Sequence, residues 1–419
     1  MIAKRKKNMT TLQTLKGFRD FLPPEKRERD FVARQIITAF ETAGFEPLET
    51  PTLEYKETIM GKYGEEADKL VYEFADRGGR EVAMRYDQTV PTARVMAQNL
   101  ATLPLPFRRY QIQNVFRADK PQKGRYREFT QCDIDIFGST SPLADAEILA
   151  TTYQAYRQIG FAKIELRVND RQLLFATLAP FTNESVSTSS LIQSIDKLDK
   201  LPAEKVIDEL VSKGLERQQA AAALEAITQT QPSANLREIM TLATQLGVPK
   251  ESLVFTPTIA RGLDYYTGLI FEVVAPEFTG GSLGGGGRYD NLINDLSGIS
   301  MPAVGIGIGF DRTVDAAREL GLIQTAKAGA KVLVTVFSSD FQKQSAQIAA
   351  QLRQAEIATE LYCEDAKLGK QFKFASRRGI PYVIVLGEDE IAQNKVLLKI
   401  METGEQRLLT VEECLSLLK

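Results

Sequence analysis

The sequence contains no histidine, although it is 419 residues long. Imidazole is the usual general base near neutral pH and the commonest metal ligand in proteins. Its absence excludes a Ser-His dyad, a His-ligated metal and a His general base. Catalysis by this chain would therefore have to use carboxylates, cations and the positioning of substrates.

Cysteine is also scarce. The three cysteines, Cys132, Cys363 and Cys414, are odd in number and far apart, and no two of them form a C-x-x-C pair. This pattern argues against a disulfide framework and against a zinc ribbon. A reducing compartment fits it best.

Long apolar segments are missing as well. No run of eighteen apolar residues occurs, and the basic start MIAKRKKNMT is not followed by an apolar segment. We therefore expect no membrane span, no secretion and a cytoplasmic location. We expect Lys4 to Lys7 to form a solvated tail, and Met9 is an alternative start.

Neither sign of charge dominates, with 52 Lys and Arg against 54 Asp and Glu. A polyanionic partner would therefore be held by local basic patches and not by a global positive field. The length allows two or three domains with a sizeable core. The proportions of hydrophobic residues, 43%, and charged residues, 25%, are those of an ordinary globular protein.

The first part of the chain alternates helical and strand-like patterns. The segment Phe45 to Glu54 has two prolines in an extended pattern, which is typical of an edge or interface strand. Further on, two strand-like runs flank a polar loop with Pro and Gly at its middle. The predicted elements are a helix over 25–43, an edge strand over 45–54, antiparallel strands over 109–116 and 128–137, a helix over 143–159 and a strand over 163–169.

The second part begins with a helical, polar stretch that we interpret as an inserted helical domain, residues 170–256. Strand patterns return at 269–275 and 303–310, and a βαβ rhythm begins at Lys331. The sequence therefore predicts an α+β domain over 10–325, with an antiparallel sheet flanked by helices and interrupted by the insertion. A second, α/β domain with a mostly parallel sheet is predicted over 331–419.

The polar loop between the two long strands is rich in cations. Its eleven positions hold Arg117, Lys120, Lys123, Arg125 and Arg127. The guanidinium group of arginine can donate two hydrogen bonds to phosphate oxygens. An aromatic ring such as that of Phe129, just after the loop, can stack on a purine. The alternative is a solvated charged hairpin.

The second long strand has an unusual polar face. Gln131, Asp133 and Asp135 share one face by the strand period of two, and Asp87 lies in RYDQT upstream. Carboxylates and amides of this kind can hold an ammonium group and an imidazole. The polar face points either to water or to a polar pocket, and a solvent-facing antiparallel sheet is the plainer interpretation.

Two further segments are candidates for ligand binding: the octapeptide Arg261 to Gly268 (RGLDYYTG) and the glycine-rich stretch Gly280 to Asp290. A glycine run lets backbone approach a ligand closely, but a mobile loop is the common alternative. The spacing Gly305-x-Gly307-x-Gly309 is not the dinucleotide fingerprint, and the chain has no phosphate loop of the G-x-x-x-x-G-K-[ST] kind. ATP would therefore have to bind at a site of another kind.

Taken together, these segments resemble the three signature motifs of class II aminoacyl-tRNA synthetases, and specifically those of the histidyl-tRNA synthetase family. The resemblance covers nearly the whole chain. Motif 1, the dimer-interface strand, is similar to residues 45–54, motif 2 to 116–138 and motif 3 to 303–312. RGLDYYTG resembles the family's histidine-specific motif.

The resemblance implies roles for individual residues. Arg261 would be catalytic, a cation close to the α-phosphate, together with the motif-2 Arg117. The implied histidine pocket comprises Asp87, Thr89, Gln131, Asp135, Tyr265, Tyr266 and Tyr289. The implied ATP site comprises Arg117, Asp119, Arg127, Phe129 and Arg312, and Lys120 and Gln122 would contact tRNA.

The sequence departs from the family's usual pattern at two of these positions. An Arg is more usual where Lys120 stands, and the commonest bacterial form has a Glu where Asp87 stands. A Lys lacks the bidentate fork of Arg, and the shorter reach of Asp would shift the pocket.

The family implies L-histidine, ATP with Mg²⁺, and histidine tRNA as ligands, and a homodimer through the motif-1 strand. No metal ligand is predicted from His or Cys, and the Mg²⁺ ligands stay open. The rival interpretation is a histidine-sensing paralogue that regulates ATP phosphoribosyltransferase. Such regulators typically lack the C-terminal domain and the full octapeptide, both of which this chain has.

Overall fold

The chain divides into two units. The first consists of residues 29–323 with the N-terminal segment up to Asp20, and the second of residues 324–419 with Phe21–Glu28. The computed structural model describes residues 12–61, 68–122, 124–199, 201–260, 265–323 and 328–419. Lys4 to Lys7, Met9, Lys123 and Arg261, which the sequence singled out, lie outside these ranges.

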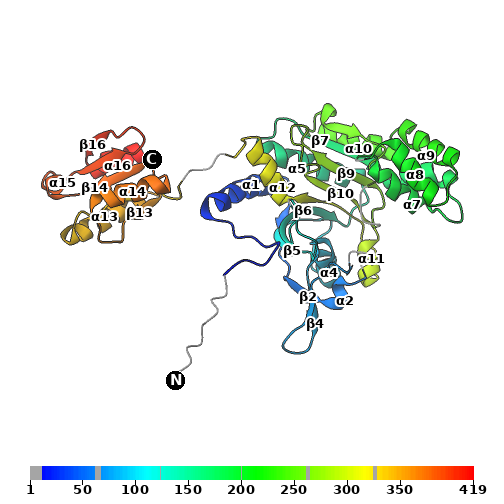
Figure 1. Ribbon diagram of the computed structural model, residues 1–419, viewed down its shortest axis with the longest axis horizontal. Helices are drawn as coiled ribbons and strands as arrows, with labels where there is room; N and C mark the ends of the chain where they lie inside the picture. Colours follow the sequence, from blue (N-terminus) through cyan, green and yellow to red (C-terminus); the bar gives the residue numbers. More distant parts are fainter. Residues whose placement is uncertain (1–11, 62–67, 123, 200, 261–264, 324–327) are drawn as a thin grey trace, which may run out of the picture. The chain divides into compact units, whose positions relative to one another are not determined.

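An eight-stranded sheet forms the centre of the first unit (Figure 1). Its strands, in spatial order, are β1 (Glu46–Pro47), β5 (Phe107–Phe116), β6 (Glu128–Phe137), β11 (Ala303–Gly309), β10 (Gly284–Arg288), β9 (Leu269–Val274), β7 (Glu165–Asp170) and β8 (Leu253–Phe255).

The six interior strands of this sheet are antiparallel to one another, and the edge strands β1 and β8 pair in parallel with β5 and β7. The predicted α+β fold with an antiparallel sheet flanked by helices is therefore confirmed for the first unit. β1 is an edge strand, as predicted, but it is only two residues long and includes Pro47. Proline has no N–H to donate to a ladder, so the segment cannot extend its pairing far.

Helices cover one face of the large sheet. They are α1 (Pro23–Thr42), α5 (Pro142–Ile159), α10 (Ala234–Gln245) and α12 (Phe310–Glu319). Side chains such as Ile36, Ile148 and Ile239 pack with Ile134 and Ile306 of the sheet into the largest apolar core. α1 begins with two prolines and ends before Gly44, whose φ of 76° suits the residue after a helix. The sheet face under these helices is thus mostly apolar, and Arg288 of β10, which pairs with Asp145 of α5, is a buried exception.

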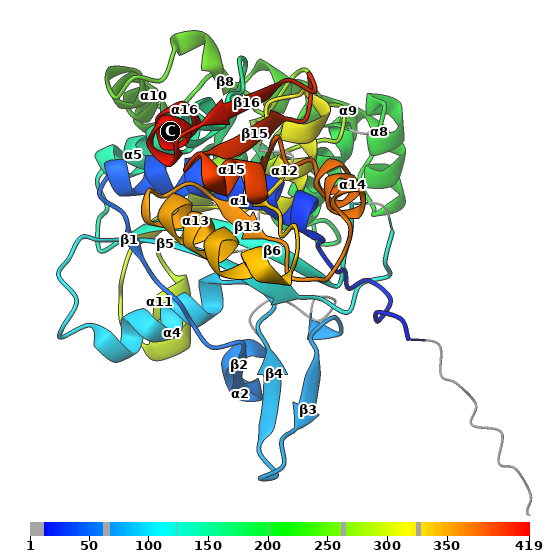
Figure 2. The same cartoon turned by 90° about the vertical axis from the view of Figure 1, so that its left-hand side faces the viewer.

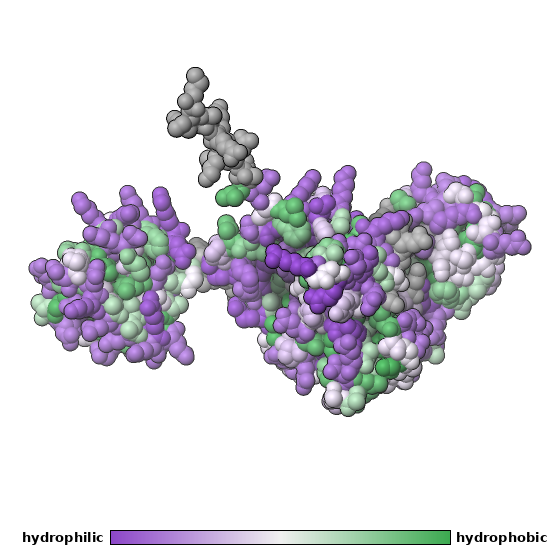
Figure 3. Space-filling view, turned by 90° about the horizontal axis from the view of Figure 1, so that it is seen from below, coloured by the Kyte–Doolittle hydropathy of each residue, from purple (hydrophilic) through white to green (hydrophobic). Residues whose placement is uncertain are grey.

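The opposite face carries smaller elements. They are α2 (Lys56–Ile59), α4 (Thr89–Asn99), α11 (Leu292–Ser297) and a three-stranded sheet of β2 (Leu53–Tyr55), β4 (Glu81–Met84) and β3 (Glu73–Ala75). Figure 2 shows β3 and β4 projecting from the large sheet as a hairpin. On the face drawn in Figure 3 apolar surface shows as separate areas among hydrophilic side chains. Leu53, Tyr55 and Phe74 of the small sheet are among the exposed apolar side chains.

The glycine run is a strand and not a mobile loop. Gly284 to Gly287 form most of β10, which pairs with β9 and β11 on both sides. A Cβ on Gly286 would lie 2.2 Å from the carbonyl oxygen of Gly305 on β11. Only glycine permits this close approach of two strands, so the run has a packing reason.

The helical stretch predicted over 170–256 divides between two cores. The first four helices are α6 (Arg171–Leu178), α7 (Thr188–Ile195), α8 (Ala203–Ser212) and α9 (Arg217–Gln229). They enclose a separate core with Leu191, Leu210 and Leu224. α10 instead packs Leu236 and Ile239 into the core of the large sheet, and β8 extends that sheet. The separate helical core therefore ends near α9, because the apolar stripe of α10 faces α5.

The second unit has its own five-stranded sheet, in the order β13 (Thr359–Leu361), β12 (Val332–Val334), β14 (Tyr382–Val385), β15 (Val396–Ile400) and β16 (Gln406–Leu409). Its helices are α13 (Gln342–Gln354), α14 (Leu368–Arg378), α15 (Glu388–Ala392) and α16 (Val411–Leu418). The first three strands are parallel, as the βαβ rhythm predicted. β15 and β16 are antiparallel, which corrects the expectation of a mostly parallel sheet. The short connections around them cannot carry a parallel crossover.

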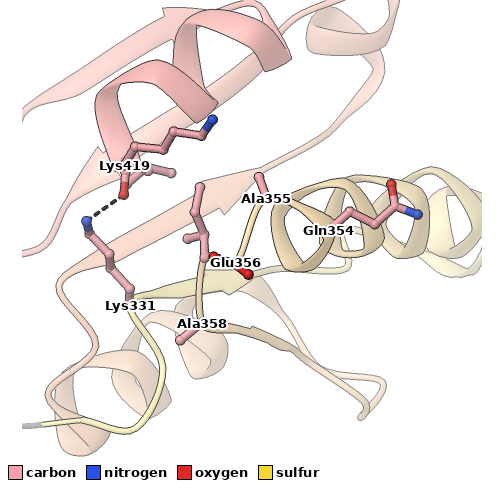
Figure 4. A pocket seen from close by; sticks show the side chains of 8 residues that line it. Lys331, Gln354, Ala355, Glu356, Ala358 and Lys419 are labelled. Carbon is pink, nitrogen blue, oxygen red and sulfur yellow. Dashed lines mark hydrogen bonds between the residues drawn. The ribbon is translucent and has the colours of Figure 1, made fainter.

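A groove of about 610 Å³ lies in the second unit, lined in part by Lys331, Glu356 and Lys419 (Figure 4). The Lys331 ammonium donates there to the backbone oxygen of Leu418. None of the residues predicted to bind ligands lines this groove. Among the helices that the structure describes, none is long and apolar enough to cross a membrane.

Candidate active site

Polar side chains and glycines form ordered rows on the face of the large sheet opposite its helices. Each row takes one residue from β5, β6 and β11. The rows are Arg109, Asp135 and Gly305; Gln111, Asp133 and Gly307; and Gln113, Gln131 and Gly309. Asp133 and Asp135 are buried, so the polar face predicted from the sequence is not a solvated sheet. We call the side-chain-free positions of β10 and β11 on this face the glycine strip, which consists of Gly285, Gly287, Gly305, Gly307 and Gly309.

The carboxylate of Asp135 is held from two sides by protein groups. Tyr289 donates its hydroxyl to one oxygen, and the fully buried guanidinium of Arg109 lies 2.5 Å from the other. The Arg109 approach is an ion pair without the alignment of a hydrogen bond. Burial raises the pKa of Asp135, while the charge of Arg109 and the Tyr289 hydroxyl lower it. Arg109 therefore offsets part of the cost of burying this carboxylate.

Three tyrosines stand beside these carboxylates. The rings of Tyr265 and Tyr266 are 4.8 Å apart, and those of Tyr265 and Tyr289 are 5.8 Å apart, both edge to face. Phe137 extends this wall, with its ring 6.4 Å from Tyr289. Burial raises the pKa of each tyrosine above its ordinary value, so the hydroxyls stay protonated as donors. The structure thus brings together the tyrosines that the sequence predicted for one pocket.

The end of the octapeptide is anchored on the strand next to it. Thr267 donates its backbone N–H to Arg288 over 2.7 Å and its hydroxyl to Asp290 over 2.8 Å. A Cβ on Gly268 would lie 3.2 Å from the side chain of Arg288, which itself pairs with the buried Asp145. These contacts fix Tyr265 and Tyr266 from one side and explain why glycine ends the motif.

Asp87, Thr89 and Gln131 lie at the start of α4 and on β6. Asp87 is buried, and one of its oxygens accepts the backbone N–H of Val90 over 3.1 Å. Thr89 is the first residue of α4 and is half-buried. The side-chain amide of Gln88 donates to the backbone oxygens of Gln131 and of Gln113 on β5, which ties α4 to the two long strands. The predicted ammonium-binding residues therefore share one neighbourhood with β6.

Arg117 lies between two aromatic rings at the end of β5. Its guanidinium is 4.3 Å from the centre of the Tyr86 ring and 5.1 Å from that of Phe129. It donates through Nε to the backbone oxygen of Tyr86 over 3.1 Å. These contacts hold the cation in a fixed place at the root of the basic loop.

Two further arginines of the basic loop are held by Asp119. Arg125 makes a bidentate pair with the buried Asp119, over 2.8 and 2.9 Å. Arg127 donates through Nε to the backbone oxygen of Asp119 over 3.0 Å, and its backbone N–H donates to Gly17 over 2.9 Å. Lys120 and Gln122 are exposed near the tip of the loop. The solvated-hairpin alternative therefore fits the tip but not the root.

Arg312 is exposed on the first turn of α12, where it donates to the backbone oxygen of Ser282 over 2.7 Å. Among the described residues no group of three or more Cys, Asp and Glu side chains has the arrangement of a metal site. Mg²⁺ that is bound to nucleotide phosphates commonly uses only one or two protein carboxylates.

Comparison with known proteins identifies the family. The model of the family Histidyl-tRNA synthetase matches residues 17–312, and that of the Anticodon binding domain matches residues 331–419. The chain belongs to the histidyl-tRNA synthetase family. The histidine–tRNA ligases of Gloeobacter violaceus and Wolinella succinogenes are each 38% identical to it, and each alignment covers 95% of this chain and 96% of the relative.

Solved structures agree with this membership. A histidyl-tRNA synthetase from a Nostoc species superposes with a TM-score of 0.85 at 30% identity, covering 96% of this chain and 99% of that one. A Bacillus halodurans protein described as an ATP phosphoribosyltransferase regulatory subunit/histidyl-tRNA synthetase has a TM-score of 0.73 at 22% identity, covering 90% and 98%. The second likeness concerns the fold alone.

Several residues of this synthetase-family site were not predicted from the sequence. Arg109 is one, although its alternation with Gln111 and Gln113 on β5 is a period-two signal like that on β6. Arg19 is another, and its partners Tyr126 and Asp311 are distant in sequence. No local pattern could have revealed that contact.

Proposed function

We propose that this histidyl-tRNA synthetase family member activates L-histidine with ATP to histidyl-adenylate, releasing pyrophosphate, and then transfers histidine to the 3′-terminal adenosine of histidine tRNA. The observation that carries this proposal is the pair of buried carboxylates on β6, Asp133 and Asp135, which lie beside the three tyrosines and the glycine strip. The chain is also related over nearly its whole length to histidine–tRNA ligases. Such a pocket suits a small ligand with an ammonium group and an imidazole.

In the proposed histidine pocket, Asp87 and Thr89 bind the ammonium group of the substrate, and Gln131 contacts the substrate from β6. Asp135 contacts the substrate beside the three tyrosines Tyr265, Tyr266 and Tyr289. A neutral phenol stays a hydrogen-bond donor, and an ionised carboxylate is an acceptor, so the two sides can satisfy an imidazole. No histidine side chain is needed for this recognition.

In the proposed ATP site, Arg117 and Arg312 contact phosphates, and Asp119 and Arg127 help to place the nucleotide. The ring of Phe129 stacks on the adenine; one side of it is already near Arg117. In the reaction a carboxylate oxygen of histidine attacks the α-phosphorus, and the bond to the β-phosphate oxygen breaks. The bonding electrons leave with pyrophosphate, which Mg²⁺ accompanies. We assign to Arg261 the stabilisation of charge growing on the α-phosphate.

The proposed tRNA contacts are distributed over the chain. The domain over 331–419 binds the anticodon. The insertion contacts the acceptor stem; it was predicted over 170–256 and is centred on α6 to α9. Lys120 and Gln122, which are exposed, contact the 5′ end of the tRNA in this proposal. We further propose a homodimer through the segment of β1, near which Leu53 and Tyr55 are exposed, and a cytoplasmic location.

Exchange of labelled pyrophosphate into ATP tests the proposed activity directly. Exchange that depends on L-histidine is expected, because adenylate formation is reversible. Exchange with no amino acid would leave the rival role, histidine sensing by a regulator of ATP phosphoribosyltransferase. Exchange with another amino acid would overturn the specificity alone.

A further inference from the structure

Arg85 is a buried arginine that joins two separate segments of the first unit. It directly follows β4 and is 3% exposed. Its guanidinium donates to the backbone oxygen of Thr50, before β2, over 2.7 Å and to that of Asn114, on β5, over 2.6 Å. A longer hydrogen bond, over 3.4 Å, reaches the backbone oxygen of Pro51. One side chain therefore connects the segment before β2 to the long strand β5.

The acceptors of Arg85 are carbonyl oxygens of the main chain, so its contacts fix the distance between two backbones. A carboxylate on a flexible side chain could follow a cation that moves, whereas a carbonyl moves only with its own backbone. A guanidinium has donors that point in different directions within one plane, so it can hold two such carbonyls at once. An ammonium group lacks this fixed geometry.

Arg85 also takes the place of a neighbouring strand along β5. In the described part of the chain, β1 pairs with only two residues of β5. Further along β5, the backbone N–H of Phe116 donates to the carbonyl of Arg85 over 3.0 Å, and the Arg85 side chain supplies the donor for Asn114. Buried peptide groups need such partners where no strand provides them. The position of Arg85 is thus fixed relative to the end of β5.

The residue after Arg85 orients the residue after Phe116, which is the motif-2 arginine Arg117. The carbonyl of Tyr86 accepts Nε of Arg117 over 3.1 Å, and the centre of the Tyr86 ring is 4.3 Å from the guanidinium. Two successive residues of one segment therefore contact two successive residues at the end of β5. A shift of Arg85 would move the Tyr86 carbonyl, and Arg117 would move with it.

We propose that Arg85 is a positioning residue for adenylate formation, which acts by fixing the Tyr86 carbonyl and ring that orient Arg117. Arg85 itself does not contact the substrates, because its guanidinium is buried against main-chain carbonyls. This inference rests on the proposed function, in which Arg117 contacts the phosphates of ATP. It adds a residue to which the family resemblance gives no role.

Arg85→Lys tests this role, since the variant keeps the charge but cannot hold two carbonyls in the same way. We expect its affinity for Mg·ATP, measured by calorimetric titration, to fall about fivefold or more. The kcat of pyrophosphate exchange per active site should fall about tenfold or more, because small displacements of a group at the reacting centre have effects of this size. Arg80→Lys is the matched control at an exposed arginine that pairs with Asp76, and it should change neither constant.

Two measurements separate positioning from a merely structural role. Active sites are counted from the pyrophosphate released in a single turnover, and stability is measured by thermal melting. A structural role would lower the melting temperature and the number of active sites, but it would leave kcat and the Mg·ATP affinity of each site unchanged. That result, or wild-type constants in Arg85→Lys, would overturn the proposal. If Arg85→Lys does not fold, Arg85→Gln, which buries no charge, takes its place with the same expectations.

A double-mutant cycle with Arg117→Lys identifies the route of the effect. In the Arg117→Lys background, Arg85→Lys should change the Mg·ATP affinity less than about twofold, because residues that act through one another are not additive. Losses that simply multiply would contradict an action through Arg117. The proposed function fails separately, if the wild type shows no exchange that depends on histidine. A wild type that did not bind Mg·ATP would overturn both.

Discussion

Arg19 and Asp311 are 292 positions apart in the sequence, and the guanidinium of Arg19 donates to the carboxylate of Asp311 over 2.7 Å. The same guanidinium lies 3.3 Å from the centre of the Tyr126 ring, in the basic loop. The other oxygen of Asp311 accepts the backbone N–H of Thr130 over 2.9 Å. One side chain thus links the basic loop to the start of α12, the two segments that we propose to hold ATP.

We expect Arg19→Ala to raise the KM for ATP about five- to tenfold, since a hydrogen bond to a charged group contributes roughly 1.5–3 kcal/mol and part of it positions the loop. The KM for histidine should change less than twofold. Arg29 also pairs with Asp311 over 2.5 Å, so α12 should stay in place. Pyrophosphate exchange at varied ATP and varied histidine measures both constants.

Arg80→Ala is the control for this substitution, because Arg80 is an exposed arginine that pairs with Asp76 away from the site. Arg19→Lys should recover part of the ATP affinity, since it keeps the charge but loses the flat guanidinium over Tyr126. An unchanged KM for ATP in Arg19→Ala would show that the loop is positioned without this contact.

The second prediction concerns Arg261, which lies outside the described residues. Arg261→Ala should slow adenylate formation about 10²–10³-fold, the usual cost of removing one preorganised donor to a developing charge. Binding of ATP and histidine should stay nearly intact. Single-turnover formation of pyrophosphate with saturating substrates measures the step, and a wild-type rate would refute the role of Arg261.

Much of the fold could be predicted from period-two and helical patterns. The two long strands around the basic loop, the helix α5 and the α/β alternation after Lys331 all lie within a few residues of their predicted ends. Gln131 and Asp135 were predicted on one face, and the structure confirms that alternation. These features are local, so the sequence contains enough information to find them.

The rest depends on contacts that are distant in the sequence. The glycine run is a strand because β9 and β11 lie on either side of it, and nothing within the run specifies those neighbours. α10 belongs with α5 although it follows helices that have another core. Arg109 looks like an ordinary strand residue until the register places it opposite Asp135.

The division of the helices between two cores leads to a third prediction. Ile239 lies in the core of the large sheet and Leu210 in the core of α6 to α9, and both are buried. Each truncation to Ala should cost about 2–5 kcal/mol of stability. Ile239→Ala should impair adenylate formation and tRNA charging together, whereas Leu210→Ala should impair charging more. Exchange and charging assays on the same preparations compare the two variants, and an equal loss in Leu210→Ala would contradict the separate role of these helices.

The fourth prediction concerns pH. Burial raises the pKa of Asp133 in the folded state well above its ordinary value, so the folded protein keeps a proton that the unfolded chain has released. Ionisation of Asp133 therefore lowers stability as pH rises above about 3.8 and through the folded pKa. The nearby Asp87 and Asp135 add to this effect, and Arg109 opposes it. Asp133→Asn should be no less stable than the wild type at pH 7, and its advantage in urea unfolding should shrink toward pH 4.5. A variant that is less stable at pH 7 would contradict the raised pKa.

The fifth prediction contrasts two neighbouring glycines of β10 that face opposite sides of the sheet. A Cβ on Gly286 would lie 2.2 Å from a backbone oxygen of β11, so Gly286→Ala must separate two strands and should prevent folding. A Cβ on Gly285 would lie 3.5 Å from the backbone oxygen of Phe271, an ordinary contact, so Gly285→Ala should fold with a melting temperature close to that of the wild type.

The methyl group added in Gly285→Ala nevertheless occupies the glycine strip, where we place the substrates. We therefore expect a rise of at least fivefold in the KM for histidine or ATP, because even one displaced contact changes affinity by this order. Circular dichroism and pyrophosphate exchange distinguish the two outcomes. A folded Gly285→Ala with wild-type constants would show that the substrates do not lie against this part of β10.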